Sequence, residues 1–272
     1  MPELPEVETV CRGIAPQIEG RSISRVKVNC KKLRIPIPKK FASILKGRKI
    51  IRVKRKAKYI VIELDSGYSL VIHLGMSGRL TIQQDYQPAK HDHIVIELDN
   101  GSLIVFNDTR KFGLATVLHE TEFDDFKFFK KLGIEPLSKE LNTVQLFKIL
   151  EKRKKNIKSV IMDSSIIVGV GNIYASESLF SAGIHPERLA SEISKKESDR
   201  LFKAIVETLK RAIEAGGSTL KDYAKANGES GYFQHQFLVY DQQDQPCSKC
   251  KRAIQKIKQN GRATYFCGKC QK

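Results

Sequence analysis

Two pairs of closely spaced cysteines near the end of the chain constrain its fold more than any other feature. Within each pair two residues intervene, and sixteen residues separate the pairs. This spacing indicates a four-thiolate zinc site, and an all-cysteine set suits a closed, tetrahedral, structural site. The alternatives are redox or disulfide chemistry, which a reducing compartment disfavours. The predicted ligands are Cys247, Cys250, Cys267 and Cys270.

The segment between the cysteine pairs, AIQKIKQNGRATYF, predicts a β-hairpin with Gly261 and Arg262 near its tip. A basic hairpin held by zinc is suited to a polyanion such as DNA, and Arg262 is the best placed contact. The two remaining cysteines, Cys11 and Cys30, are expected to be ordinary buried thiols.

Basic residues are in large excess and are concentrated in three runs. The chain has 48 Lys and Arg against 30 Asp and Glu, a formal net charge of +18. Residues 46–58 and 247–272 each hold eight basic residues and no acid, and residues 148–158 hold six with one acid. One such run is usually a solvated face, but three could form a single groove for a nucleic acid.

The N-terminal sequence and the lack of long apolar stretches predict an intracellular protein. MPELPEVET is acidic where a secretory signal would be basic. No apolar stretch of the sequence reaches the roughly 18 residues that a membrane helix needs. We therefore expect a cytoplasmic protein that acts at the nucleoid, with reduced cysteines and no membrane partner.

The apolar spacing changes along the chain from helical to strand-like. Residues 5–19 have helical spacing, with Pro16 expected to kink or shorten the helix and Gly20 to end it. Residues 59–74 and 93–108 each have a D-x-G turn between apolar arms, which predicts two β-hairpins. Their similarity suggests an internally symmetric antiparallel sandwich.

A helical region follows the strands. The last expected helix begins at the capping box Ser194-x-x-Glu197 and stops at Gly216-Gly217. Residues 217–235 are polar and contain several glycines, as in a mobile loop. The expected helices are 143–154, 157–164, 172–182 and 195–215.

The N-terminal residues Pro2 and Glu3 suggest a catalytic hypothesis. Removal of the initiator methionine would leave Pro2 with a free secondary amine, which titrates near ~8 and is partly neutral at physiological pH. Such an amine can attack a sugar C1′ and give an iminium cation, which permits elimination of the flanking phosphates. Glu3 could act as general acid or base. From these residues alone, a proline-led, acid-rich helix start is the better interpretation.

Two further motifs allow both a functional and a structural interpretation. In the VGVGN segment at 168–172, Asn172 suits an N-cap and two glycines could admit a phosphate, although a tight helix–helix turn explains the glycines equally well. Phe112, which follows Arg110 and Lys111, suits a wedge that enters a base stack, but in isolation it suits a core position better. We interpret His91-Asp92-His93 as strand alternation rather than a metal pair.

Taken together, the motifs resemble those of the bacterial formamidopyrimidine-DNA glycosylase family from end to end. The segments that carry the resemblance are MPELPEVET, RKAKY (55–59), HLGMSGRL (73–80), NDTRKFG (107–113), VGVGNIYASESLFSAGIHP (168–186), GGSTLKDY (216–223) and the four-cysteine tail.

The resemblance implies an α+β fold with two domains. An N-terminal helix and antiparallel β-sandwich (1–130) would be joined to a helical domain with a helix–two-turn–helix element and a lesion-recognition loop (131–235). The zinc-finger hairpin would occupy 236–272.

The resemblance also implies a bifunctional glycosylase and abasic-site lyase. It would flip oxidised purines, such as 8-oxoguanine or formamidopyrimidine, out of double-stranded DNA and act as a monomer. Pro2 would be the nucleophile and Glu3 the proton donor. Lys58 would assist base loss and β-elimination, and Arg262 would grip the flanking phosphates. One structural Zn²⁺ would be the only cofactor.

The remaining implied roles concern DNA and the lesion. Met76, Arg110 and Phe112 would fill the gap left by the flipped base. His91, Arg153, Lys158 and Asn172 would hold phosphates. The lesion pocket would involve Glu6, Glu177, Ser218, Thr219 and Tyr223.

Two alternatives stay open. An endonuclease VIII-like glycosylase would share the architecture but prefer oxidised pyrimidines. A catalytically inactive zinc-finger protein would bind damaged DNA without cutting it, although the intact Pro2, Glu3 and Lys58 argue against this.

Overall fold

The structure is a computed structural model that describes residues 2–218 and 232–272. It divides into two compact units. Unit 1 combines Met1–Lys130 with Ala215–Tyr232, so far as these residues are described, and unit 2 combines Lys131–Glu214 with Phe233–Lys272. Across the described part of the chain, no helix is both long and apolar enough to cross a bilayer.

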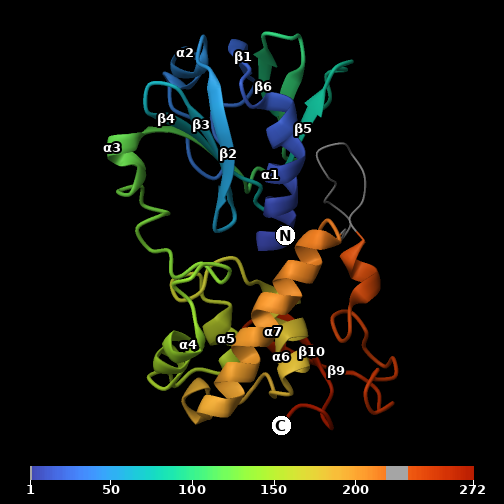
Figure 1. Cartoon of the computed structure of the whole chain (residues 1–272). Helices are drawn as coiled ribbons and strands as arrows, with labels where there is room; N and C mark the ends of the chain where they lie inside the picture. Colours follow the sequence, from blue (N-terminus) through green and yellow to red (C-terminus); the bar gives the residue numbers. More distant parts are fainter. Residues whose placement is uncertain (1, 219–231) are drawn as a thin grey trace. The chain divides into compact units, whose positions relative to one another are not determined.

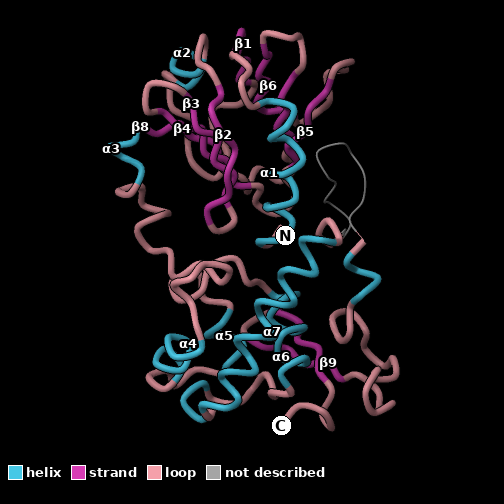
Figure 2. The backbone as a smooth tube through the Cα atoms, viewed as in Figure 1, coloured by secondary structure: helices cyan, strands magenta, loops and turns pink. Residues whose placement is uncertain are grey.

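Unit 1 contains two four-stranded antiparallel sheets, with strand orders β1-β6-β7-β5 and β2-β3-β4-β8 (Figures 1 and 2). The two predicted hairpins, β3–β4 and β6–β7, are confirmed, and each occupies the two central positions of its sheet. The elements are α1 (Leu4–Ile18), β1 (Ile23–Val28), α2 (Phe41–Leu45), β2 (Ile50–Lys56), β3 (Tyr59–Leu64), β4 (Tyr68–His73), β5 (Arg79–Gln83), β6 (Asp92–Leu98), β7 (Leu103–Asn107), β8 (Leu114–His119) and α3 (Glu120–Phe123).

Both sheets and α1 contribute to one hydrophobic core. Alternate residues of the central strands point inward, such as Ile60 and Ile62 of β3 and Ile94 and Ile96 of β6. The helix adds its apolar stripe, Val7, Val10, Ile14 and Ile18. The helix therefore has a fixed position on the sandwich, and so does its first turn.

One detail of α1 differs from expectation. Pro16 neither ends nor shortens the helix, which continues to Ile18. A proline removes one N–H donor from a helix. Here it lies in the last turn, and the chain leaves the helix through Gly20, whose φ of +82° is easy only for glycine.

Unit 2 is helical and ends in the cysteine module (Figure 1). Helix α6 matches the predicted bounds and is buried on nearly all sides, and α7 starts at the predicted capping box, where Ser194 N donates to Glu197 Oε2 (2.9 Å). The elements are α4 (Thr143–Leu150), α5 (Ile157–Ile161), α6 (Asn172–Ala182), η1 (Ala190–Glu192), α7 (Lys195–Glu214), η2 (Phe233–Gln236), β9 (Gln255–Gln259) and β10 (Arg262–Phe266).

The predicted zinc hairpin is present as β9 and β10, joined by Asn260 and Gly261. Gln259 pairs with Arg262 across the turn, so Arg262 stands at its tip, as expected. A small core that includes Phe180 of α6 packs against the cysteines and β10. This core fixes the hairpin on the helices of unit 2.

Candidate functional site

The first turn of α1 brings together three of the predicted site residues. The backbone N–H of Glu3 donates to Glu6 Oε2 (2.8 Å). The other oxygen of that carboxylate accepts from the amide and the hydroxyl of Ser218 (2.8 and 2.9 Å). Glu6 and Ser218 are almost fully buried, as is Glu3. Glu6 therefore holds the start of the helix, directly after Pro2, against the segment that follows α7.

Lys58 lies in the two-residue turn between β2 and β3. Lys56 pairs with Tyr59, which leaves Ala57 and Lys58 as the turn residues. Lys58 is half-buried. The end of β4 brings His73 close to it, and the ring of His73 lies 4.8 Å from that of Tyr59.

Two cations and one carboxylate lie near His73. Burial, together with the nearby cations Arg34 and Lys58, lowers the pKa of His73 to about 4. Its Nδ1 accepts from the amide of Gly75 (2.9 Å), as a neutral ring can. The imidazole is therefore uncharged at neutral pH and adds no positive charge to those of Arg34 and Lys58.

Met76, Arg110 and Phe112 project from two adjacent loops of unit 1. Met76 is 37% exposed and Phe112 47% exposed, so the alternative that Phe112 is a core residue is wrong. The guanidinium carbon of Arg110 lies 4.7 Å from the centre of the Phe112 ring. Exposed apolar side chains beside a cation suit insertion into a base stack.

Buried Asp108 joins these two loops. Its carboxylate accepts from Ser77 Oγ (2.6 Å) in the Met76 loop and from Gly113 N (2.8 Å) and Arg110 N (3.2 Å) in the other loop. Its own N–H donates to the carbonyl of His91 (3.1 Å), a residue with φ of +77° just before β6. The loops that carry Met76, Arg110 and Phe112 and the segment that carries His91 are thus all bonded to Asp108.

In unit 2 a groove of about 220 Å³ brings Asn172 and Arg262 together. Asn172 Nδ2 donates to the carbonyl of Ala263 (2.9 Å), which ties α6 to β10. The expectation that Asn172 is the N-cap is wrong, because Gly171 is the N-cap and Asn172 is the first helical residue. The side-chain amide of Asn172 and the exposed guanidinium group of Arg262 are donors that suit a phosphate.

Lys158 also borders this groove, but its ammonium group points inward. It donates to Asn172 Oδ1 and Thr264 Oγ1, both at 2.6 Å, and the residue is only 2% exposed. We therefore assign Lys158 to support of Asn172 and β10 rather than to direct phosphate contact.

Two other predicted residues of unit 2 lie apart from the groove. The carboxylate of Glu177 is fully buried and accepts from three successive amides, those of residues 238–240 (2.8–3.0 Å). It thus holds the segment that leads into the cysteine module, and we do not retain it as a lesion contact. Arg153 is exposed after α4, where a phosphate could reach it.

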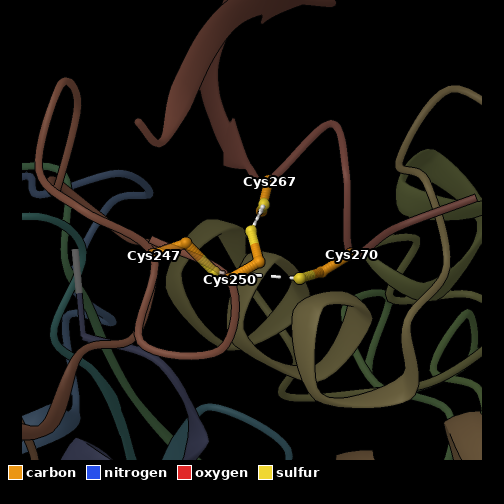
Figure 3. A group of neighbouring side chains, drawn as sticks. All are labelled: Cys247, Cys250, Cys267 and Cys270. Carbon is orange, nitrogen blue, oxygen red and sulfur yellow. Dashed lines mark hydrogen bonds between the residues drawn. The ribbon is translucent and has the colours of Figure 1, made fainter. Parts of the chain in front are cut away.

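The four cysteine sulfurs converge at one point of the module (Figure 3). All lie within 4.8 Å of one another, with Cys247 and Cys270 separated by 3.9 Å and Cys250 and Cys267 by 3.5 Å. Tetrahedral Zn–S bonds of about 2.3 Å place sulfurs roughly 3.8 Å apart, so the observed set fits zinc. The site is closed by its own four ligands, which makes it structural.

Comparisons with known proteins decide the family. The chain is 48% identical over 272 residues to a formamidopyrimidine-DNA glycosylase of Wolbachia pipientis subsp. Culex pipiens (strain wPip), with all of both chains covered. The chain belongs to the formamidopyrimidine-DNA glycosylase family. Three family models agree: the formamidopyrimidine-DNA glycosylase N-terminal domain (residues 1–115), its H2TH domain (132–224), and the zinc finger found in FPG and IleRS (244–272).

Solved structures extend the likeness to the three-dimensional fold. The crystal structure of the MutM (Fpg) protein from Thermus thermophilus has a TM-score of 0.89 at 34% identity, covering 99% of this chain and 98% of that one. A Lactococcus lactis FPG mutant, in complex with a DNA containing Fapy-dG, has a TM-score of 0.92 at 32% identity, covering 99% of both chains. The predicted family, α+β fold and structural zinc are thus confirmed.

In this formamidopyrimidine-DNA glycosylase family member, two predicted site residues lie outside the part of the chain that the structure describes, and one residue of the site was not predicted. Thr219 and Tyr223, with most of the predicted 217–235 loop, fall outside the described residues. Asp108 is not among the predicted site residues. Its position in an Asn-Asp turn just before Arg110 and Phe112 was the available signal.

Removal of zinc is expected to disorder the β9–β10 hairpin and weaken DNA binding. Arg262 would lose its fixed position, and loss of one charge-assisted contact costs roughly 1.5–3 kcal/mol, so the affinity for an abasic duplex should fall about tenfold or more. Metal content and the dissociation constant would be measured on Cys267→Ser, with Cys30→Ser as the matched control. Unchanged affinity in metal-free protein would contradict the structural role of zinc.

Proposed function

We propose that this chain excises oxidised purines from duplex DNA and then cuts the strand, with Pro2 as nucleophile and Glu3 as general acid and base. Family membership places it among base-excision-repair glycosylases. The observation that carries the residue assignment is the bond from the Glu3 amide to Glu6 Oε2. It fixes the backbone at the start of α1, directly after Pro2.

In the proposed reaction the neutral Pro2 amine attacks C1′ of the damaged nucleoside. The bond from C1′ to the base breaks, and the base leaves with a proton. Glu3 donates a proton to the ring oxygen, O4′, as the sugar opens, which leaves an iminium cation on Pro2. Removal of the Met1 residue is a requirement, because only then does Pro2 carry an amine.

Strand cleavage then follows from the iminium cation. It acidifies the 2′ proton, whose loss expels the 3′ phosphate, and a second elimination expels the 5′ phosphate. Hydrolysis of the remaining iminium cation by water frees Pro2. We propose that Lys58 assists base loss and the first elimination. Arg262 would hold the phosphates at which the bonds break.

DNA recognition is proposed to use both units. In unit 1 the exposed Met76, Arg110 and Phe112 would fill the space that the flipped base leaves, and His91 would hold a phosphate. In unit 2 Asn172 and Arg262 line one groove and would hold the DNA backbone. Arg153, which precedes α5 in the sequence, would hold a further phosphate. Glu6 and Ser218 would border the lesion. We propose a monomer that works on chromosomal DNA in the cytoplasm.

The proposed substrate class is tested by direct competition between lesions. The protein should release 8-oxoguanine paired with cytosine faster than thymine glycol in an otherwise identical duplex, by about tenfold or more, since a site built for polar groups of one base rejects another strongly. Quantitative cleavage gels under single-turnover conditions measure both rates. A preference for thymine glycol would leave the mechanism in place and favour the endonuclease VIII-like alternative. Tight binding of both duplexes without cleavage would favour the inactive DNA-binding protein.

A further inference from the structure

Arg55, near the end of β2, joins two elements that carry proposed catalytic residues. Its Nε donates to Glu8 Oε2 of α1 (2.9 Å), and its Nη1 donates to the carbonyl of Ala57 (3.0 Å). The Arg55 side chain is only 11% exposed. All of these residues belong to unit 1. One guanidinium group therefore connects the helix that follows Pro2 and Glu3 to the turn that contains Lys58.

The acceptor on the helix is itself held in place. Glu8 is half-buried, and its other oxygen, Oε1, accepts from Arg12 Nε one helical turn later (2.8 Å). Each oxygen thus has its own guanidinium donor, the largely buried Arg55 for one and the exposed Arg12 for the other. Glu8 lies in the first turns of α1, close in sequence to Pro2 and Glu3. Arg55 is therefore bonded to the end of the helix that carries the proposed catalytic residues.

The turn on the other side has an unfavourable backbone conformation at its first residue. Ala57 has φ of +54° at the first position of a two-residue hairpin turn. A side chain makes this left-handed conformation unfavourable, and glycine is the residue usually found there. Ala57 is also almost fully buried. The hydrogen bond from Arg55 to its carbonyl stabilises this backbone conformation directly before Lys58.

We propose that Arg55 is a positioning residue, which sets the place of Lys58 relative to the Pro2–Glu3 end of α1. The inference rests on the proposed function, since it matters only if Lys58 takes part in the reaction. Arginine suits the task because its rigid fork of donors holds two acceptors at fixed angles. The position lies within the basic run 46–58, but its contacts distinguish Arg55 from a solvated charge.

The test is a double-mutant cycle between Arg55 and Lys58. The variants are Arg55→Gln, Lys58→Gln and the double variant, with Arg25→Gln, an exposed strand arginine of the same unit, as a control that removes the same charge. The rate of strand cleavage at an abasic duplex would be measured in single turnovers with saturating enzyme. Affinity for a duplex with a tetrahydrofuran abasic analogue, and thermal unfolding, would be measured alongside.

We expect Arg55→Gln to lower the cleavage rate about 10- to 100-fold, because misplacement by about 1 Å has effects of this size. Affinity for the analogue should change less than about threefold, and Arg25→Gln should keep the original rate. The decisive result is non-additivity: in the Lys58→Gln background, loss of Arg55 should cause little further loss of rate. A role confined to stability would lower the unfolding temperature of Arg55→Gln without this coupling.

The outcomes separate the inference from the proposed function. If Lys58→Gln is slow and the two effects multiply, Arg55 does not act through Lys58 and the inference is wrong. If Lys58→Gln cleaves at the original rate, the proposed role of Lys58 is wrong and the inference is lost with it. If Arg55→Gln alone cleaves at the original rate, the inference is wrong whatever Lys58 does.

Discussion

A chain that keeps one extra residue in front of Pro2 is expected to bind abasic DNA and leave it uncut. The Pro2 nitrogen would then be part of an amide, whose lone pair is delocalised into the carbonyl group and cannot attack a sugar. Loss of a nucleophile of this kind lowers the rate by at least about 10⁴-fold. Cleavage of an abasic duplex in single turnovers measures the loss, and affinity for a tetrahydrofuran duplex shows whether binding survives.

The same sample supplies its own control. A tag that a protease removes directly before Pro2 would give blocked and free protein from one preparation, and cleavage of the tag should restore the full rate. This reversal separates chemistry from folding, because the rest of the chain is unchanged. Equal strand cleavage before and after tag removal would show that the nucleophile lies elsewhere, with Lys58 the first alternative.

The second large effect is expected from Glu3→Gln. Glutamine keeps the size of the side chain and leaves the backbone bond from residue 3 to Glu6 in place, but it cannot donate and recover a proton as a carboxyl group does. General acid–base catalysis contributes about 10²- to 10⁴-fold, and we expect excision of 8-oxoguanine to slow by that factor. The excision rate is measured in single turnovers by chromatography of the released free base.

Glu140→Gln, an exposed carboxylate that no proposed role involves, serves as the matched control. It should excise the base at the original rate, and both variants should bind the lesion duplex with unchanged affinity. Normal excision by Glu3→Gln would remove Glu3 from the mechanism. Equal loss of excision and of binding would make its role one of binding rather than of proton transfer.

Features set by neighbours in sequence were predictable from the chain alone. The Cys-x2-Cys pairs determine a metal site because each pair offers two sulfurs from one short turn. The D-x-G turns of residues 59–74 and 93–108 determine hairpins for a similar local reason. Helix α6 matched its predicted bounds because the glycines at its two ends, Gly171 and Gly183, are local signals too.

Features set by distant partners were not predictable in this way. The resemblance implies a phosphate contact for Lys158, but its ammonium donates to Thr264, more than a hundred residues later. The resemblance implies a place in the lesion pocket for Glu177, but its carboxylate accepts from three amides of 238–240. Arg55 is one cation among eight in its run, and its contacts with Glu8 and Ala57 distinguish it from a solvated charge.

The covalent role of Pro2 is the central claim, and trapping of the reaction intermediate tests it most directly. Purified protein would be incubated with a duplex that contains 8-oxoguanine opposite cytosine, and borohydride would be added to reduce any iminium or imine. The cross-linked peptide would then be mapped by mass spectrometry. We predict one adduct, on the nitrogen of Pro2, in a chain that lacks Met1. An adduct on a lysine such as Lys58, or no adduct in a protein that binds and cuts the duplex, would contradict the account.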